Sequence, residues 1–450
     1  MLFQSQIPGL FQQLHMNLDQ AANTARKADA AKRLAYYYDA QVDYIIEQLQ
    51  KTFSEPEKLT PCFVNIVKKV INNLSMVYLK DAIRTIEGNV SDQKIFSEIS
   101  KSSALPVKVK TASRLVKLLK IILIRPVWRK GKMDLDTLTG DILDVQTGDT
   151  PEDLQAVMIT HYPESLKQDE IEFSLWTDEE VKRLDYRGNV ISVDPNPYRV
   201  IPFIPIWDRC PTDSFWLPGG DDLINAQDAL NEKLTDLLYV IRMQGFGVGW
   251  IKKSKQGQGS IQVDPGSLVE LPENGDLGFE SQKAPISEIL DAIDFLITQA
   301  AMANGLSAST LSTKVVRESG LAKVAGNREL EELRRDDIIL FREYETKLFN
   351  MFRIVWNAHN PGRKMSDKAE IKIDFYDPKP TISPLDQAET WEKLIALGVA
   401  SPIDAAMERN SDLKTREEAQ EYLLKIQAEN QLFTGTNTKG VEEDGIASNS

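Results

Sequence analysis

The sequence predicts a mixed α+β fold that is rich in helix. Apolar residues recur every three to four positions over long segments such as 221–243 and 327–358, and this spacing is typical of amphipathic helices. Between 121 and 208 the chain changes to short runs of β-branched and aromatic residues, which are typical of strands. The 450 residues are 42% hydrophobic and 27% charged, as expected for a globular protein of about two to four domains.

Charge and metal-binding residues limit the classes of function. The net charge of −14 argues against a protein that coats DNA tightly, because duplex binding depends on neutralising phosphates. The negative charge does not exclude a protein that lets DNA slide past it. Cys62 and Cys210 are far apart and the three histidines are scattered, so we expect a cytosolic protein with incidental thiols and no metal site.

Motifs of catalysis and targeting are missing from the sequence. No phosphate-cradling G-x-x-x-x-G-K-[ST] occurs, and "GFGVG" at 245–249 lacks the spacing of a dinucleotide-binding loop. The N-terminus lacks a signal-peptide pattern, and no apolar run of about 18 residues predicts a membrane span. Pairs such as Asp134/Asp136 and Asp221/Asp222 are expected by chance among 67 acidic residues. The sequence therefore predicts a structural or interaction protein that uses no cofactor and is not an enzyme.

The first part of the chain is predicted to begin with helices. Residues 1–16 are uncharged and Gln-rich, which favours a loose arm, and Asn17 is a candidate cap for a helix reaching about Phe53. Further helices are predicted over 62–79 and 91–101.

Strands follow over 121–208. They are predicted at "ILIRPVW", "AVMITHY", "IEFSLWT" and "VIPFIPIW", with "YRGN" (186–189) as a turn between strands. Four prolines within 194–206 favour an extended edge or linker over a central strand, because proline donates no ladder hydrogen bond.

Residues 107–132 hold nine Lys and Arg and no acid. One interpretation is a helix that binds nucleic acid or a membrane surface. The other is an ordinary packed helix whose basic face is solvated or pairs with an acidic neighbouring subunit. Charge runs are usually solvated, so the second interpretation is favoured.

The second part of the chain is predicted to contain a helical hairpin. A helix over 221–243 opens with two acids at the positive end of its dipole. A Gly-rich segment over 245–279 has strand candidates at 248–253 and 267–271, and a second helix covers 286–304.

A basic, Gly-punctuated stretch, "STKVVRESGLAKVAGN" (312–327), leads into a helix of about 32 residues from Asn327 to about Ala358. Asn327 is a candidate N-cap, and glutamates follow it in the first turns. A strand is predicted over 370–378. Helices over 384–397 and 415–432 flank a short helix in "GVASPIDAAMER", and the tail 434–450 is expected to be disordered.

The order of these parts resembles the portal proteins of tailed bacteriophages. The resemblance covers about residues 60–430 and rests on three stretches in order: "NPYRVIPFIPIW" (196–207), "QDALNEKLTDL" (227–237) and "SGLA" (319–322).

The resemblance implies a portal-type fold with a wing, a stem helix hairpin, a clip and a C-terminal helical crown. Its implied boundaries are a flexible arm at 1–16, wing at 17–220, stem helix at 221–244, clip at 245–284, second stem helix at 285–304, tunnel loop at 305–326, long wing helix and strand at 327–379, crown at 380–433 and disordered tail at 434–450.

The resemblance also implies a function. It implies a ring, normally of twelve subunits, at one capsid vertex of a virion, made in the host cytoplasm, through which double-stranded DNA is packaged, retained and ejected. The implied partners are the terminase large subunit, a head–tail adaptor protein and the major capsid protein, with no membrane. The alternatives are another head–tail adaptor or scaffold protein, and a nucleic-acid-processing enzyme that uses the basic stretch.

Two groups of basic residues are the candidate sites under this resemblance. Lys314, Arg317 and Lys323 of the tunnel loop would contact DNA phosphates without sequence preference, or would be solvated charges or intersubunit salt bridges. In the clip, the candidates for docking a partner are Lys252, Lys253 and Lys255, with plain solvent exposure as the alternative.

Overall fold

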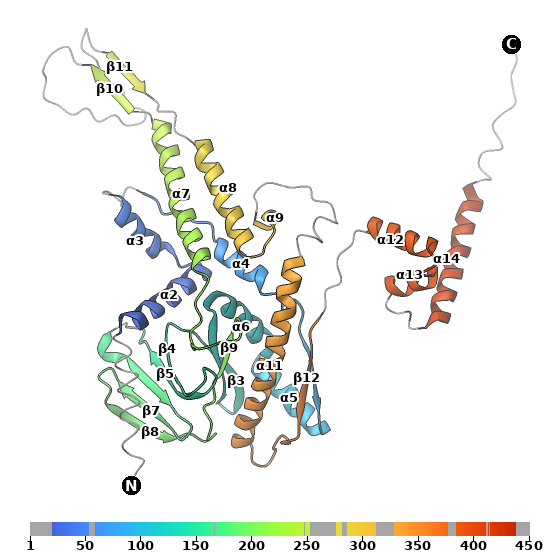
Figure 1. The fold of residues 1–450 in the computed structure, drawn as a ribbon, viewed down its shortest axis with the longest axis horizontal. Helices are drawn as coiled ribbons and strands as arrows, with labels where there is room; N and C mark the ends of the chain where they lie inside the picture. The colour runs from blue at the N-terminus through green and yellow to red at the C-terminus, as the bar shows by residue number, and fades with distance from the viewer. Residues whose placement is uncertain are drawn as a thin grey trace. The chain divides into compact units, whose positions relative to one another are not determined.

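The computed structural model describes residues 20–53, 59–165, 167–246, 248–252, 276–280, 286–311, 328–376, 384–410, 413 and 415–437 (Figure 1). The chain divides into two compact units, one of residues 1–317 with 326–377 and one of residues 318–325 with 378–450. The predicted mixture of helices and strands is confirmed.

The larger unit begins with five helices. They are α2 (Ala21–Tyr37), α3 (Val42–Thr52), α4 (Ile66–Leu74), α5 (Val90–Ser102) and α6 (Leu105–Leu119). The single helix predicted up to Phe53 is wrong, because Asp39 adopts a left-handed φ of 64° that ends α2. The helix predicted over 62–79 is shorter, because the Asn65 side chain caps it by accepting a hydrogen bond from the Lys68 backbone N–H.

The described residues of the larger unit also form three sheets from ten strands. Their bounds are β1 (Ile83–Glu87), β2 (Ile121–Arg129), β3 (Lys132–Leu138), β4 (Leu143–Thr147), β5 (Leu154–His161), β6 (Glu172–Trp176), β7 (Glu180–Asp185), β8 (Val190–Pro195), β9 (Ile204–Trp207) and β12 (Glu370–Asp374), with a 3-10 turn at Gln168–Glu170. The strand orders are β3-β2-β9, β4-β5-β6-β7-β8 and β1-β12, and all pairs are antiparallel.

Two local predictions about these strands are confirmed. The turn over 186–189 joins β7 to β8, and Gly188 there has a φ of 83°. The Pro-rich stretch ends in β9, which is an edge strand of its sheet and pairs only with β2. Pro205 therefore lies in a strand where the missing backbone N–H of proline is tolerated.

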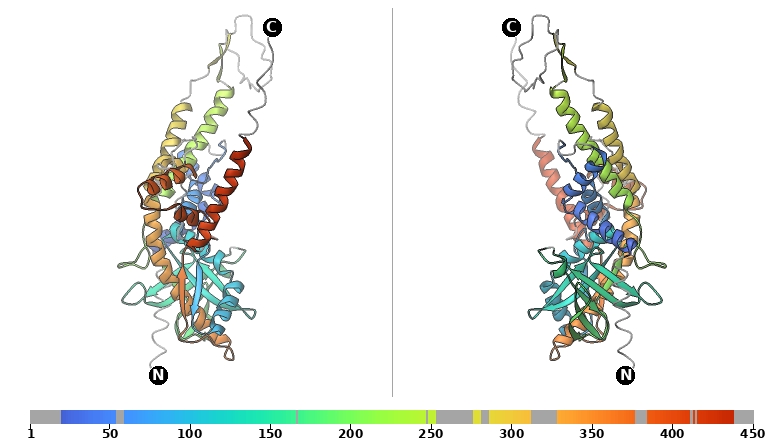
Figure 2. Two further views of the ribbon diagram at one scale, coloured as in Figure 1. Left: turned by 90° about the vertical axis from the view of Figure 1, so that its right-hand side faces the viewer. Right: turned by 90° about the vertical axis from the view of Figure 1, so that its left-hand side faces the viewer.

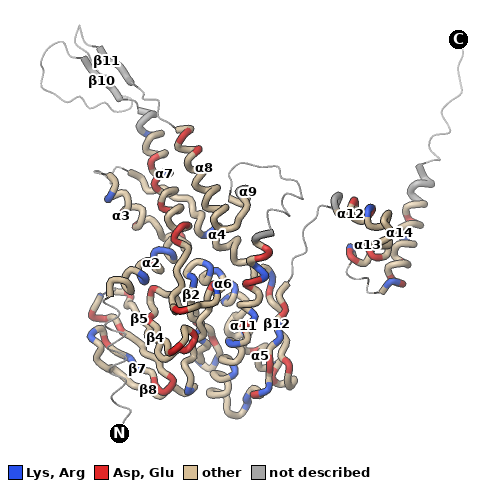
Figure 3. The backbone as a smooth tube through the Cα atoms, viewed as in Figure 1, with Lys and Arg blue, Asp and Glu red and all other residues tan. Residues whose placement is uncertain are grey.

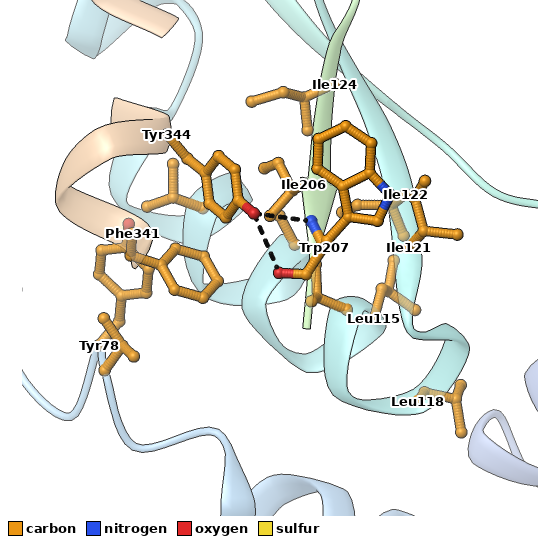
Figure 4. Packing of buried hydrophobic residues seen from close by; sticks show 14 of the residues in the cluster. Tyr78, Leu115, Leu118, Ile121, Ile122, Ile124, Ile206, Trp207, Phe341 and Tyr344 are labelled. Carbon is orange, nitrogen blue, oxygen red and sulfur yellow. Dashed lines mark hydrogen bonds between the residues drawn. The ribbon is translucent and has the colours of Figure 1, made fainter. Parts of the chain in front are cut away.

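The core of the larger unit lies where α6 and the long helix α11 (Arg328–His359) cover β2 and β9 (Figure 4). The Tyr344 hydroxyl of α11 lies 3.2 Å from the Trp207 backbone N and 3.3 Å from its carbonyl oxygen. Phe352 is fully buried on the same helix. The predicted 32-residue helix is thus confirmed in length, and its apolar stripe lies in the core.

The smaller unit contains three helices, α12 (Pro384–Ala396), α13 (Pro402–Arg409) and α14 (Arg416–Asn437). α13 opens with a capping box in which Ser401 and Asp404 exchange hydrogen bonds with each other's backbone N–H groups. The three helices predicted in this region are confirmed.

Candidate functional site: a helical hairpin and its anchored root

Two long helices of the larger unit form a hairpin. α7 (Asp221–Phe246) and α8 (Ile286–Ala303) lie side by side, as the two views of Figure 2 show, and the short helix α9 (Ala308–Leu311) packs at the base of α8. At the far end β10 (Val248–Lys252) pairs antiparallel with β11 (Asp276–Glu280). The predicted hairpin and its first strand are confirmed, whereas the strand candidate at 267–271 lies outside the described residues.

The hairpin carries both buried and exposed apolar side chains. Near the root of α7, Leu223 and Leu230 are buried in the core. Other apolar side chains are exposed to solvent on both helices: Leu238 (44%), Tyr239 (38%) and Ile241 (47%) on α7, and Leu290 (47%), Phe295 (62%) and Met302 (59%) on α8. We call these six residues the apolar surface of the hairpin. Two adjacent helices that expose so many large apolar side chains are typical of a surface that another protein covers.

The hairpin is also acidic (Figure 3). α7 and α8 carry the acids Asp221, Asp222, Asp228, Glu232, Asp236, Glu288, Asp291 and Asp294 against the bases Lys233 and Arg242. A surface with this balance repels the phosphates of a nucleic acid in place of binding them.

A ladder of buried amide and hydroxyl groups anchors the root of α7. Gln227, Asn231 and Thr235 are spaced four residues apart and at most 1% exposed. The Gln227 Oε1 accepts from the backbone N–H of Ile66 at 2.8 Å, and its Nε2 donates to Asn231 Oδ1 at 2.8 Å. The Asn231 Nδ2 donates to Gln41 Oε1 at 2.9 Å. The ladder therefore joins α7 to the start of α4 and to the residue before α3, and its signal in the sequence is the polar i, i+4 spacing on an otherwise apolar face.

Charged contacts from α2 hold the first turns of α7. Arg33 is 5% exposed, donates to the Gly219 carbonyl at 2.7 Å and pairs with Asp221. Two turns later Asp228 pairs with Lys32 at 2.7 Å and accepts a hydrogen bond from the Tyr36 hydroxyl. Burial, and then the neighbouring Asp228 carboxylate, raise the pKa of Tyr36. The hairpin thus projects from a rigid base.

Five of the nine bases of the stretch 107–132 pair with acids of its own chain. The ion pairs are Lys108–Asp134, Lys117–Asp208, Lys117–Asp337, Lys120–Asp208, Arg125–Asp136, Arg129–Asp134 and Arg129–Asp136. Of the two interpretations, these pairs and the buried apolar side of α6 favour the ordinary packed helix, with the difference that its partners are acids of its own chain and not of a neighbouring subunit. Asp134, Asp136 and Asp221, three members of the acid pairs Asp134/Asp136 and Asp221/Asp222, form ion pairs with bases. These ion pairs give the three carboxylates a structural role.

Lys117 is the centre of the most buried of these clusters. Its Nζ lies 2.8 Å from Asp208 Oδ1 and 2.7 Å from Asp337 Oδ1. Burial lowers the pKa of Lys117, but the charges of Asp208 and Asp337 outweigh burial and raise it overall. Burial raises the pKa of Asp337 to about 6, although the positive charge of Lys117 lowers it. The Oδ2 atom of Asp337 is buried and has no hydrogen-bond partner among the described residues. Asp208 has a lowered pKa, because Lys117 and Lys120 together outweigh its burial.

Most of the predicted site residues cannot be placed. Lys252 ends β10, at the far end of the hairpin. The other clip and tunnel-loop candidates, Lys253, Lys255, Lys314, Arg317 and Lys323, lie outside the described residues, as do the predicted caps Asn17 and Asn327.

Among the residues that the structure describes, no group of three or more His, Cys, Asp or Glu could hold a metal ion. None of the described helices is long and apolar enough to cross a membrane.

Comparison with protein-family models identifies the family of the chain. The chain matches, over residues 23–432, the family model described as phage portal protein, SPP1 Gp6-like. This is a family of structural proteins and not a class of enzymes. Because the match spans most of the 450 residues, the chain belongs to the phage portal protein family, which confirms the resemblance found in the sequence.

Three solved structures are similar to the chain at 13% identity. The neck of an empty gene transfer agent particle, computed with C6 symmetry, aligns with a TM-score of 0.43 over 76% of this chain and 87% of that chain. The virion of a native gene transfer agent particle aligns with a TM-score of 0.40, and the neck of a native particle, computed with C12 symmetry, with a TM-score of 0.43; each covers 75% of this chain and 87% of the other. No curated protein matches the chain.

Proposed function

We propose that this protein assembles into a ring, of twelve subunits, that forms the DNA channel at one capsid vertex of a phage or phage-like particle. The observation that carries the proposal is the hairpin of α7 and α8, which is acidic and exposes an apolar surface, in a chain of the portal family. The ring would pass double-stranded DNA without sequence preference during packaging, retention and ejection. The chemical work would belong to a separate motor, the terminase large subunit.

The apolar surface of the hairpin supports a ring of identical subunits. Phe295 and Met302 lie seven residues apart on α8, so they share one face of that helix. A surface that is covered by the hairpin of the next subunit repeats around a closed ring and leaves no apolar face open. Each subunit then needs its neighbours on both sides to bury these side chains.

The charge of the hairpin supports a bore through which DNA slides. The excess of acids over bases on α7 and α8 would repel the phosphate backbone, so DNA would pass without sticking. A few basic side chains in the loop before α11, Lys314, Arg317 and Lys323, would centre it through phosphate contacts.

The other parts are proposed to take the places that the family implies. In this proposal α7 and α8 are the stem, residues 245–284 the clip, 305–326 the tunnel loop and 380–433 the crown, with residues 17–220 and α11 as the wing. Lys252, Lys253 and Lys255 of the clip would dock the terminase and later a head–tail adaptor, and the wing would contact the major capsid protein.

The direct test of the proposal is electron microscopy of the purified protein seen end-on. We expect rings with a central hole. A monomer or compact dimer at high concentration would contradict the ring, and clear nuclease or ATPase turnover with Mg²⁺ would favour the enzyme alternative instead.

A double substitution tests the role of the loop. Lys314→Ala with Arg317→Ala is expected to leave ring assembly intact and to reduce packaging or retention of DNA, because two phosphate contacts per subunit are lost. Rings are counted by microscopy, and packaged DNA is measured as nuclease-protected length. The matched control is Lys110→Ala, which removes a base on α6. Failure of assembly would show that the two loop residues are structural contacts.

A further inference from the structure

The last turn of α6 joins two parts of the larger unit that the proposed function must keep in register. One is the root of the hairpin and the other is the start of α11. We call this turn, residues 117–120, the junction. It ends at Lys120, whose left-handed φ of 69° turns the chain out of the helix and into β2.

On one side the junction contacts the root of α7. The Leu118 carbonyl accepts a hydrogen bond from Arg33 Nη1 at 3.3 Å, and the same nitrogen donates to the Gly219 carbonyl at 2.7 Å. A Cβ added at Gly220, which has a φ of 84°, would lie 2.7 Å from Arg33 Nη1 and 3.2 Å from Lys120 Cε. Arg33 and Lys120 therefore close directly on the two residues that precede α7.

On the other side the junction contacts α11. Lys117 reaches Asp337, in the third turn of α11, at 2.7 Å, and this carboxylate is 6% exposed. Asp208 completes the link, since it lies 2.8 Å from Lys117 and 3.0 Å from Lys120, and its backbone N–H donates to the Lys120 carbonyl at 2.9 Å. Polar contacts thus link Asp337 to Lys117, and the Leu118 carbonyl in the same turn of backbone links the junction through Arg33 to the start of α7.

Arg334 gives the same part of α11 a second anchor. Its side chain is 3% exposed and donates to the Met76 carbonyl at 3.3 Å and to the Tyr376 carbonyl. The Met76 carbonyl lies between α4 and β1, and the Tyr376 carbonyl lies two residues after β12, so Arg334 ties α11 to the segments that flank this sheet. Lys117 ties α11 to the junction instead.

We propose that Lys117 is a positioning residue, which holds the start of α11 in a set position relative to the root of the hairpin. The inference rests on the proposed function for its purpose, because the helices of each subunit must keep one arrangement to form a closed ring. Its physical basis does not depend on that function: the Lys117 ammonium, shielded from solvent, is shared by the carboxylates of Asp208 and Asp337, and each of the three groups loses its partner when one of them moves.

The test is hydrogen exchange on the purified full-length protein in its native assembly state. In Lys117→Met, residues 328–337 are expected to exchange about tenfold faster, because the ion pair with Asp337 is lost. Residues 221–230 are expected to follow, because the turn that carries the Leu118 carbonyl loses the link of Lys117 to Asp208. Lys117→Arg keeps the charge and is expected to restore most of the protection. The matched control is Lys110→Met, because Lys110 lies on the same helix and forms no ion pair with the described residues.

The outcomes separate this inference from the proposed function. Faster exchange in 328–337 alone, with 221–230 unchanged, would overturn the link and leave Lys117 as a local contact of α11. If Lys117→Met does not fold, Asp337→Asn is measured instead, with faster exchange expected in both segments and an unchanged hairpin root again contradicting the link. Where rings form and both segments loosen, DNA retention is expected to fall; normal retention would overturn the positioning role, whereas a wild-type protein that forms no ring would contradict the proposed function alone.

Discussion

Phe295→Asp is expected to abolish assembly of the ring while the single chain stays folded. Phe295 is 62% exposed on α8, so replacing its phenyl side chain costs the single subunit little packing. In the assembly the new carboxylate would be buried against an apolar neighbour, and burying an unpaired charge costs several kcal/mol. A loss of about 3 kcal/mol at each interface weakens each subunit contact roughly a hundredfold, and a ring meets this loss at every interface.

Sedimentation velocity or mass photometry, run across a range of concentrations, measures the effect. Circular dichroism of the unassembled variant should match that of the wild type. Ser97→Asp is the control, because it adds the same charge at an exposed polar position on α5, outside the hairpin. Rings that form normally in Phe295→Asp would show that the apolar surface of the hairpin is not the subunit interface.

Glu345→Gln is expected to destabilise the larger unit by about 3–5 kcal/mol, because it leaves a buried guanidinium without its counter-charge. Glu345 on α11 is 4% exposed and accepts two hydrogen bonds from Arg84 of β1, each at 2.5 Å, and one from the Tyr78 hydroxyl at 2.6 Å. Burial, and then the Glu345 charge, raise the pKa of Tyr78, so the tyrosine stays a neutral donor. This loss is a large part of the stability of an ordinary domain.

Denaturant unfolding of the wild type and the variant, compared in the same assembly state, measures the cost. Glu343→Gln is the matched control, because Glu343 pairs with Lys347 on the surface of the same helix at 2.8 Å and is 61% exposed. We expect its effect to stay below about 1 kcal/mol. Equal losses in the two variants would mean that the Arg84–Glu345 pair is no more important than a surface pair.

Local periodicity was enough to find the main elements of the hairpin and the long helix. α7, α8 and α11 bury one stripe of side chains each, so their apolar spacing is visible within a short window of sequence. The break between α2 and α3 was missed, because it depends on the left-handed Asp39 and on the burial of Gln41 against α7, neither of which alters the helical pattern.

The charges of the basic stretch show why contacts were harder to predict than elements. Lys117 pairs with Asp208 and with Asp337, and the latter is 220 residues away in the chain. Nothing in a window around Lys117 distinguishes it from Lys110, which forms no ion pair with the described residues. The basic residues proposed to contact DNA and to dock a partner therefore remain predictions from the family resemblance.

By itself the sequence determined the helical hairpin, the 32-residue helix and the acidic balance, because each depends on composition or on spacing along the chain. The portal family followed from the resemblance of particular stretches and from the family match over residues 23–432. Only the tertiary structure decided that β1 pairs with β12, that Gln227 anchors the hairpin and that most bases of the basic stretch pair with acids of their own chain. Those contacts join segments far apart in sequence, and the free energy of burying a polar group depends on which partner the fold brings to it.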